Sequence, residues 1–223
     1  MEMESTLADG TRVLFRPIRA SDKDMLQIGL QQLSPESRYR RFFRHIDHLS
    51  EGQLQYLTEV DGHDHVAWIA VLPDAPGSPG IGVGRYIRLK GEPEVAEAAV
   101  TVIDSHHNQG LGRTLLRLLA RSAIENGVRA FRAWTLGDNH PMMGLLQDLG
   151  ARPGRWEGGV LELTVPLPSD VEDLDQTPGP LILREVARGT LQVEAHPDRP
   201  AGARLMPPPE LQSGISPTRR ESH

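Results

Sequence analysis

The chain has no cysteine among its 223 residues. This absence excludes disulfide bonds, thiolate zinc sites and cysteine nucleophiles. Histidine does not take over as a metal ligand, because no convincing set at metal-ligand spacing is found among His45, His48, His63, His65, His106 and His107. We therefore expect no metal site.

Long hydrophobic runs and an excess of basic residues are also missing. The longest apolar run, near Val66 to Leu72, is far too short to span a membrane, and residues 1–5 are acidic and polar. We expect a cytoplasmic protein without a membrane partner. The formal net charge is −6, which argues against a dedicated nucleic-acid-binding protein.

The composition is that of one folded domain followed by a tail. A hydrophobic content of 38% in 223 residues supports one sizeable core, whereas a second full domain would be cramped. From Pro168 onward, frequent prolines punctuate a polar stretch with little periodicity. This composition predicts that residues 169–223 form a largely disordered tail. Two short apolar segments within it, 181–183 and 191–193, leave two alternatives open, an appended hairpin or docking on the sheet.

Periodicity and cap residues predict alternating strands and helices. The predicted strands cover residues 12–17, 66–72, 81–89, 95–103, 129–135 and 160–166. The predicted helices cover residues 22–33, a segment from 35 onward, 50–60, 110–126 and 141–149, with Ser21, Ser34, Ser50 and Asn139 as caps. This order is typical of an α/β or α+β domain with a mixed sheet.

The most informative segment runs from Val100 to Leu116, where an apolar strand passes through a glycine turn into an amphipathic helix. Backbone N–H groups at the start of a helix are unpaired, and the positive end of the helix dipole lies behind them. Gly110 and Gly112 let a ligand approach the main chain. We expect a phosphate site in which residues 109–114 supply the donors.

The turn does not fit the common nucleotide motifs. It lacks the Gly-Lys-Ser/Thr ending of a P-loop and the three glycines of a dinucleotide fingerprint. Residues 107–112, His-Asn-Gln-Gly-Leu-Gly, instead resemble motif A of the GNAT superfamily of N-acetyltransferases, which holds the pyrophosphate of acetyl-CoA. The segment departs from the family pattern at His107, where the family has Arg or Gln.

Other segments resemble the same superfamily in the same order along the chain. Residues 13–22 are similar to its first strand and helix entry, and residues 138–151 to its late helix. Residues 33–43, 49–61 and 65–71 are similar to the branch that includes bacterial protein-lysine acetyltransferases. The resemblance implies a GNAT domain over residues 11–168, with a mixed, mostly antiparallel central sheet flanked by helices.

The resemblance also implies roles for individual residues. Glu97 lies in an otherwise apolar strand, on the same face as Ala99 and Thr101, where the family's glutamate commonly serves as general base. A strand-end salt bridge is the structural alternative. The implied acetyl-CoA-binding residues are Val102 and Ile103 through their main chain, His107, Asn108, Gln109, Gly110, Leu111, Gly112, Arg113, Thr114 and Asn139.

One of these assignments has a structural alternative, and one residue common in the family is missing. Asn139 is explained equally well as a plain helix cap. Many family members protonate the departing thiolate with a tyrosine from the late helix, but Tyr39, Tyr56 and Tyr86 all precede the phosphate turn. This chain therefore cannot use a tyrosine in the same way.

The expected activity is direct transfer of an acetyl group from acetyl-CoA to an amine in a ternary complex. The acceptor is a protein lysine or a small-molecule amine, and the protein is a monomer or a homodimer. Two other functions stay open. A catalytically silent acyl-CoA sensor would agree with His107 and the missing late tyrosine. An RNA-binding protein would use the arginine-rich segment 38–44, which a solvated helix with Phe42 and Phe43 in the core also explains.

Overall fold

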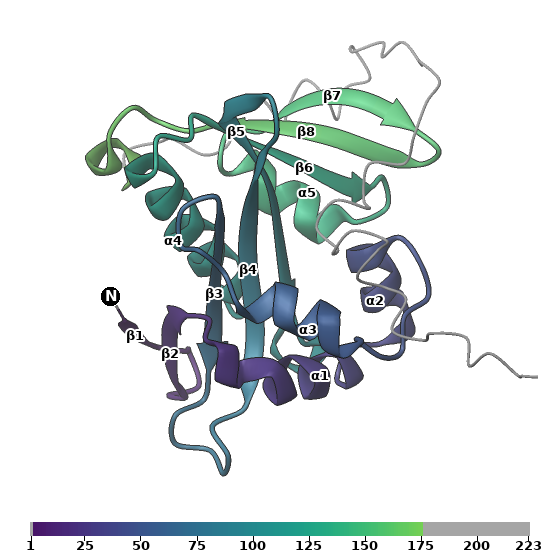
Figure 1. Cartoon of the computed structure of the whole chain (residues 1–223), viewed down its shortest axis with the longest axis vertical. Helices are drawn as coiled ribbons and strands as arrows, with labels where there is room; N and C mark the ends of the chain where they lie inside the picture. The colour runs from purple at the N-terminus through teal and green to yellow at the C-terminus, as the bar shows by residue number, and fades with distance from the viewer. Residues whose placement is uncertain (1, 176–223) are drawn as a thin grey trace, which may run out of the picture.

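The computed structural model describes residues 2–175, which build an eight-stranded sheet with helices on both faces (Figure 1). The strands are β1 (Met3–Thr6), β2 (Arg12–Pro17), β3 (His65–Val71), β4 (Gly80–Leu89), β5 (Glu92–Val102), β6 (Ala130–Leu136), β7 (Arg152–Glu157) and β8 (Val160–Pro166). They lie in the order β1-β2-β3-β4-β5-β6-β8-β7, and within residues 2–175 the pair β5–β6 alone is parallel. The predicted mixed, mostly antiparallel sheet is confirmed.

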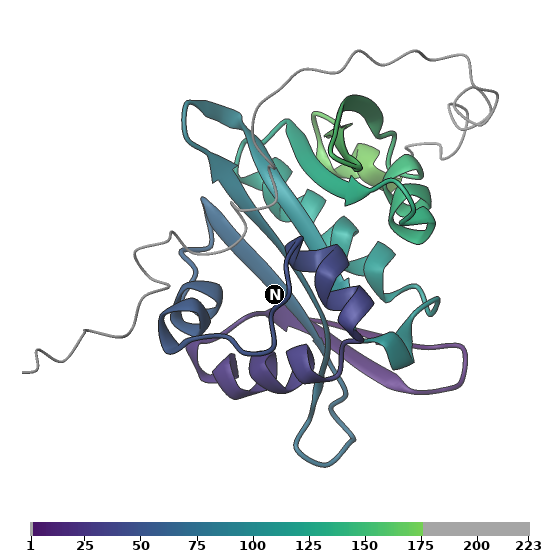
Figure 2. The same ribbon diagram turned by 90° about the vertical axis from the view of Figure 1, so that its right-hand side faces the viewer.

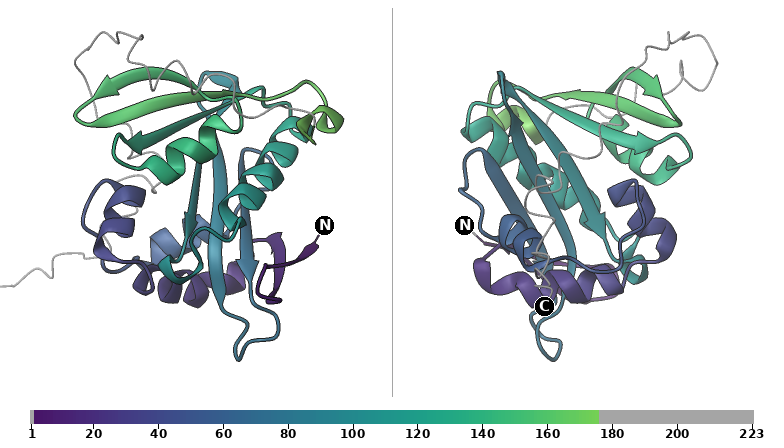
Figure 3. Two further views of the ribbon diagram at one scale, coloured as in Figure 1. Left: turned by 180° about the vertical axis from the view of Figure 1, so that it is seen from behind. Right: turned by 45° about the vertical axis from the view of Figure 1, so that its right-hand side comes forward.

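Five α-helices cover the sheet within the described part of the chain. They are α1 (Lys23–Gln31), α2 (Pro35–Phe42), α3 (Glu51–Thr58), α4 (Leu111–Glu125) and α5 (His140–Gln147), with 3₁₀ turns at Ala20–Asp22, Asp104–His106 and Val171–Asp175. The helix α4 packs across β3, β4 and β5 on one face, while α1 and α3 cover the other (Figures 1 and 3). The helix α2 stands at the side of the sheet, on the same side as α5 (Figure 1).

Two glycines of β4 bring α4 close to the sheet. A Cβ at Gly84 would lie 2.9 Å from Leu119 Cδ1, and one at Gly82 would lie 3.2 Å from Leu115 Cδ1. Both leucines are fully buried, and a side chain on either glycine would push them away from the strand. This close packing fixes the N-terminus of α4 beside the end of β5.

The parallel pairing of β5 and β6 is short. It covers only Val95–Glu97 against Ala130–Arg132, whereas β4 accompanies β5 as far as Val102. Beyond Glu97 the two strands separate, and β6, β8 and β7 turn away from the direction of β3, β4 and β5 (Figures 1 and 2). One edge of β5 is therefore exposed between the two halves of the sheet.

Local cap chemistry determines most helix starts as predicted. The hydroxyls of Ser34 and Ser50 accept the backbone N–H of Ser37 and Gln53, and the side chain of Asn139 accepts that of Met142. Ser21 as a cap is wrong, because it lies inside the 3₁₀ turn Ala20–Asp22.

The turn that contains Ser21 is organised by a buried ion pair. Asp22 accepts two hydrogen bonds from the buried guanidinium of Arg16, at 2.7 and 2.8 Å, and a third from the Arg19 amide. The first residues of α1 are therefore determined by this tertiary contact rather than by a local serine cap.

The sequence reading missed two edge strands and the start of a third. The strand β1 begins before the predicted domain start at Thr11, β7 was not predicted, and β5 begins at Glu92 rather than Val95. Most of the predicted tail, including both apolar segments, lies outside the described residues. Its first part forms the turn Val171–Asp175, which contacts α4.

Candidate functional site

The loop between β5 and α4 has the backbone of an anion-binding turn. Asn108 and Gly110 both adopt left-handed conformations, with φ of 61° and 82°. The first helical hydrogen bond joins the Thr114 N–H to the Gly110 carbonyl at 3.1 Å. The N–H groups of Leu111, Gly112 and Arg113 therefore precede the helical ladder and point out of the helix start.

The structure corrects the predicted donor set at Thr114. The Thr114 N–H is already used by the first turn of α4, and its side chain does not line the groove described below. Gln109 is exposed and also lies outside that lining. The groove is instead lined by His107, Asn108 and the four residues from Gly110 to Arg113.

Two side chains predicted to meet phosphate are engaged with the protein. His107 Nε2 lies 2.8 Å from the carbonyl oxygen of Val102, so the ring folds back on the end of β5. Arg113 forms an ion pair with Asp148, which follows α5. The loop therefore presents mainly backbone N–H groups to the groove.

The loop borders a groove of about 580 Å³. Its walls come from α2, from β5 between Glu97 and Val102, from the start of α4, from β6 between Ala133 and Thr135, and from α5. It occupies the gap that opens where β5 and β6 stop pairing. Asn139 caps α5 and lies in the same lining.

The exposed edge of β5 offers main-chain groups to this groove. Polar groups of successive strand residues point to opposite edges. The Ile103 N–H donates to Ile81 of the β4 side at 3.0 Å, so Ile103 as a cofactor-binding donor is wrong. Beyond the last β5–β6 register pair, Glu97 with Arg132, the alternation turns the N–H groups of Val100 and Val102 toward the groove, and both residues line it.

Glu97 lies at the point where the parallel strands part. Its side chain is 1% exposed and borders the groove. Residues that lie opposite each other in a strand pair share one face of the sheet. Glu97, Ala99 and Thr101 share the face covered by α1 and α3, as the period-two pattern predicted. Their partners on β4 are Ile87, Arg85 and Val83.

Two arginines lie on the same side of the groove as Glu97. Burial lowers the pKa of Arg85 to about 9, an effect to which the nearby charge of Arg41 adds. Burial lowers the pKa of Arg41 to about 10, and the negative charge of Glu97 opposes that effect. Sequence reasoning missed both arginines as parts of the site, because only the fold brings α2 and β4 to Glu97.

The arginine-rich segment divides its side chains between the core and the groove. Phe42 packs against the hydrophobic core, as predicted. Phe43 ends α2 in a left-handed conformation, with φ of 52°, and lines the groove instead. The α2 side of the groove therefore contains Ser37, Arg40, Arg41 and Phe43.

These features agree with the comparisons with known proteins. A family model described as acetyltransferase (GNAT) family matches residues 23–151. The chain belongs to the GNAT acetyltransferase family. It is 34% identical over 168 residues to acetyltransferase Pat of Mycolicibacterium smegmatis, covering 73% of this chain and 50% of that protein. It is 31% identical over 145 residues to acetyltransferase PA5475 of Pseudomonas aeruginosa, covering 65% of this chain and 77% of that protein.

Solved structures show the same relationship. The GNAT domain of S. lividans PAT superposes with a TM-score of 0.68 at 32% identity, covering 74% of this chain and 97% of that one. A cAMP-binding acyltransferase from Mycobacterium smegmatis superposes with a TM-score of 0.54 at 28% identity, covering 86% of this chain but 56% of that one. The chain thus spans about half the length of the Mycolicibacterium relative that it matches.

The groove fits acetyl-CoA, which the GNAT family uses as acyl donor. The unpaired N–H groups at the start of α4 suit a pyrophosphate, and the N–H groups on the open edge of β5 suit an amide-bearing chain laid beside a strand. Within residues 2–175, no tyrosine lines the groove.

Other site types find little support in the described chain. Among residues 2–175, no cluster of histidine and acidic side chains has the arrangement of a metal site. None of the helices in this range is long and apolar enough to cross a membrane.

Proposed function

We propose that this GNAT protein transfers an acetyl group from acetyl-CoA directly to an amine, with Glu97 as the general base. One observation carries the proposal. The free N–H groups of the α4 start and the buried carboxylate of Glu97 border the same groove, which opens where β5 and β6 part. In this proposal, cofactor binding and proton removal take place in the same groove.

Backbone groups perform most of the cofactor binding in this proposal. The N–H groups of Leu111, Gly112 and Arg113 hold the pyrophosphate at the positive end of the α4 dipole. The open edge of β5 aligns the pantetheine arm, and its N–H groups at Val100 and Val102 are available to stabilise the oxyanion. Asn139 lies at the far wall, beside the start of α5.

Acetyl-CoA supplies the activated thioester, and the protein must prepare the amine. An unperturbed lysine amine has a pKa of about 10.4 and is protonated at neutral pH. Glu97 removes the proton before or during attack of the nitrogen on the thioester carbonyl. Thiols have pKa values near 8.5, so the departing thiolate is a tolerable leaving group and takes its proton from water.

We propose a protein lysine as the acceptor. Residues 33–43, which resemble the lysine-acetylating branch, include α2 and line the groove near Glu97. Residues 49–61, which resemble the same branch, include α3 and line the adjoining cavity. A small-molecule amine is the second candidate, because the groove is large enough for either.

The experiment that tests this function measures thiol release from acetyl-CoA with lysine peptides and small amines as acceptors. Acceptor-dependent release of coenzyme A supports the proposal. A catalytically silent acyl-CoA sensor, favoured by the position of His107 and the absence of a groove tyrosine among the described residues, would bind coenzyme A and release no thiol.

A further inference from the structure

We propose that the acceptor carries a carboxylate close to its reactive amine, and that Arg41 and Thr101 bind this carboxylate. The inference rests on the proposed acetyl transfer and names the chemistry of the acceptor. It concerns the part of the groove beside Glu97, away from the phosphate-binding start of α4.

Arg41 differs from its neighbours on α2. Arg38 pairs with Asp47 at 2.7 Å, and Arg40 pairs with Glu36 at 2.6 Å. For Arg41, within residues 2–175, the structure shows no hydrogen bond or close ion pair, and its guanidinium stacks at 5.0 Å on the ring of Phe42. Glu97 acts on this guanidinium through its charge but forms no hydrogen bond with it. A half-buried guanidinium without hydrogen-bond acceptors is costly, so a carboxylate bound here would stabilise it.

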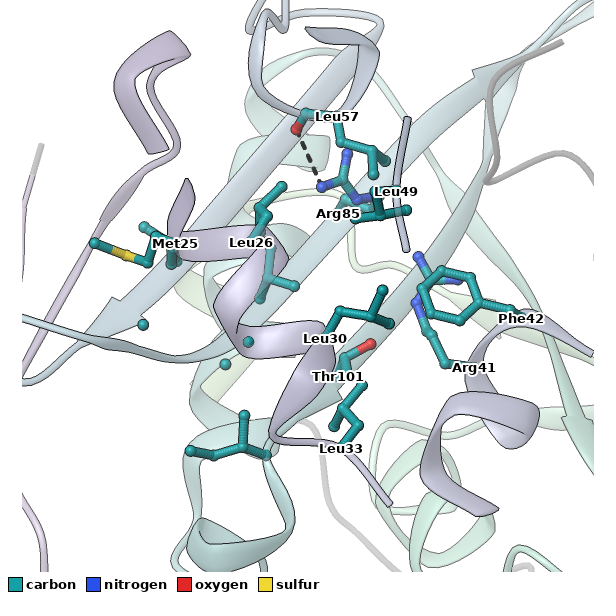
Figure 4. A pocket seen from close by; sticks show the side chains of 16 residues that line it. Met25, Leu26, Leu30, Leu33, Arg41, Phe42, Leu49, Leu57, Arg85 and Thr101 are labelled. Atoms are coloured by element: carbon teal, nitrogen blue, oxygen red, sulfur yellow. Dashed lines mark hydrogen bonds between the residues drawn. The ribbon is translucent and has the colours of Figure 1, made fainter. Parts of the chain in front are cut away.

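Thr101 adds a second unsatisfied donor at the same place. Its Oγ1 is buried and has no hydrogen-bond partner among the described residues. Thr101 and Arg41 line both the groove and an adjoining apolar cavity of about 70 Å³ under α1, so they lie where the two spaces meet. Figure 4 shows both side chains in the lining of the cavity. Buried polar groups are almost always paired, and a carboxylate has enough lone pairs to satisfy both.

Apart from Glu97, which the proposed function assigns to the amine, the charges around Arg41 are positive. Arg85 is 2% exposed and donates to the Leu57 carbonyl at 3.1 Å and to His65 at 3.0 Å. It adds a second positive charge beside Arg41. The remaining wall of the cavity is apolar, including Leu30, Leu33 and Phe42. An acidic side chain next to the target lysine would therefore be attracted, and a basic one repelled.

The test compares two peptides that differ only in the residue next to the single lysine, Glu in one and Gln in the other. The ratio of their kcat/KM values does not depend on how much of a preparation is folded. We expect the native protein to favour the Glu peptide by about tenfold, as for one charge-assisted hydrogen bond. Arg41→Gln and Thr101→Val should each reduce the ratio, with Arg41→Gln bringing it near one.

Arg121→Gln serves as the matched control, because Arg121 is exposed on α4 and pairs with Glu125. It should leave the ratio unchanged. A ratio near one in the native protein, or a ratio that survives Arg41→Gln, overturns the proposal. The carboxylate could also belong to the acyl group, and a comparison of acetyl-CoA with succinyl-CoA tests that alternative. If Arg41→Gln changes only the use of succinyl-CoA, the anion belongs to the acyl group and the acceptor proposal is wrong.

Equilibrium binding separates this inference from the proposed function. Both peptides are titrated into the protein saturated with coenzyme A, where no transfer takes place. Stronger binding of the Glu peptide that depends on Arg41 supports the carboxylate site even if no thiol release is ever observed. Equal binding of the two peptides by the native protein counts against it.

Discussion

Glu97 of β5 and Arg132 of β6 form the last register pair of the two parallel strands, and the groove opens directly beyond them. The guanidinium of Arg132 forms an ion pair at 2.8 Å with Glu92, the first residue of β5. The position of the proposed base is thus set by the same feature that creates the binding site.

The first prediction concerns the loop that would hold the pyrophosphate. Gly110 and Gly127 flank α4, have φ of 82° and 77°, and face open space. Replacing either by leucine should cost about 1–2 kcal/mol of folding free energy, because both positions are left-handed. Only Gly110→Leu should also weaken coenzyme A binding, which calorimetry measures. Equal affinities in the two variants would exclude the loop as the phosphate site.

The second prediction concerns the connection between this loop and α2. Asp104 accepts the Ser34 N–H at 2.8 Å, the Ser34 hydroxyl at 3.0 Å and the Ser37 hydroxyl at 2.7 Å. Although burial alone raises the pKa of Asp104, these hydrogen bonds outweigh it and hold the pKa below its ordinary value. This contribution to stability is present above the unfolded pKa and is lost as the pH falls through the folded one.

Asp104→Asn should therefore lower the free energy of unfolding by about 1–2 kcal/mol, which is a few degrees in Tm for a domain of this size. Because α2 forms one wall of the groove, the KM for the acceptor should rise while the affinity for coenzyme A changes little. The control is Asp47→Asn, whose carboxylate is 91% exposed in its pair with Arg38. Indistinguishable Tm and KM values for the two variants would contradict this role of Asp104.

The third prediction concerns pH and stability. Burial, with the neighbouring charge of Arg85, lowers the pKa of His65 to about 4. Since Arg85 can only donate, His65 Nε2 accepts its hydrogen bond at 3.0 Å and the ring is neutral. Between pH 6.5 and 4 the unfolded chain takes up a proton that the folded protein does not, so stability falls as the pH falls. This loss is on the order of 3 kcal/mol.

Urea unfolding at pH 7 and pH 4.5 measures this effect. His65→Gln should be less stable at pH 7 but should lose less stability on acidification than the native protein. His63→Gln, at an exposed position, should keep the native pH dependence. If the free energy of unfolding of His65→Gln falls between pH 7 and pH 4.5 as much as that of the native protein, another group causes the pH dependence.

The sequence predicted features that depend on neighbouring residues. The caps Ser34, Ser50 and Asn139 follow from local chemistry, and the face shared by Glu97 and Thr101 follows from the strand period. It could not predict which edge of β5 each N–H meets, because that depends on where β4 pairs. This explains the error at Ile103, whose N–H is used by Ile81.

Features that depend on distant contacts were missed for a related reason. The start of α1 depends on Asp22 and the buried Arg16, and a local pattern of serine and acidic residues does not reveal that pair. The edge strands β1 and β7 are short and mostly exposed, so they carry no apolar alternation. Asp104 reaches Ser34 only because the folded chain brings the phosphate loop beside α2.

Glu97→Gln removes the proposed base, and the variant is compared with the native protein by thiol release from acetyl-CoA across pH 6–9 and by calorimetry with coenzyme A. We expect the affinity for coenzyme A to be retained and kcat/KM near neutral pH to fall by about 10²–10⁴-fold. The deficit should shrink at high pH, where the amine deprotonates without help. An unchanged rate throughout this range would contradict a base at Glu97, and a parallel loss of coenzyme A affinity would show that the carboxylate supports the groove rather than the reaction.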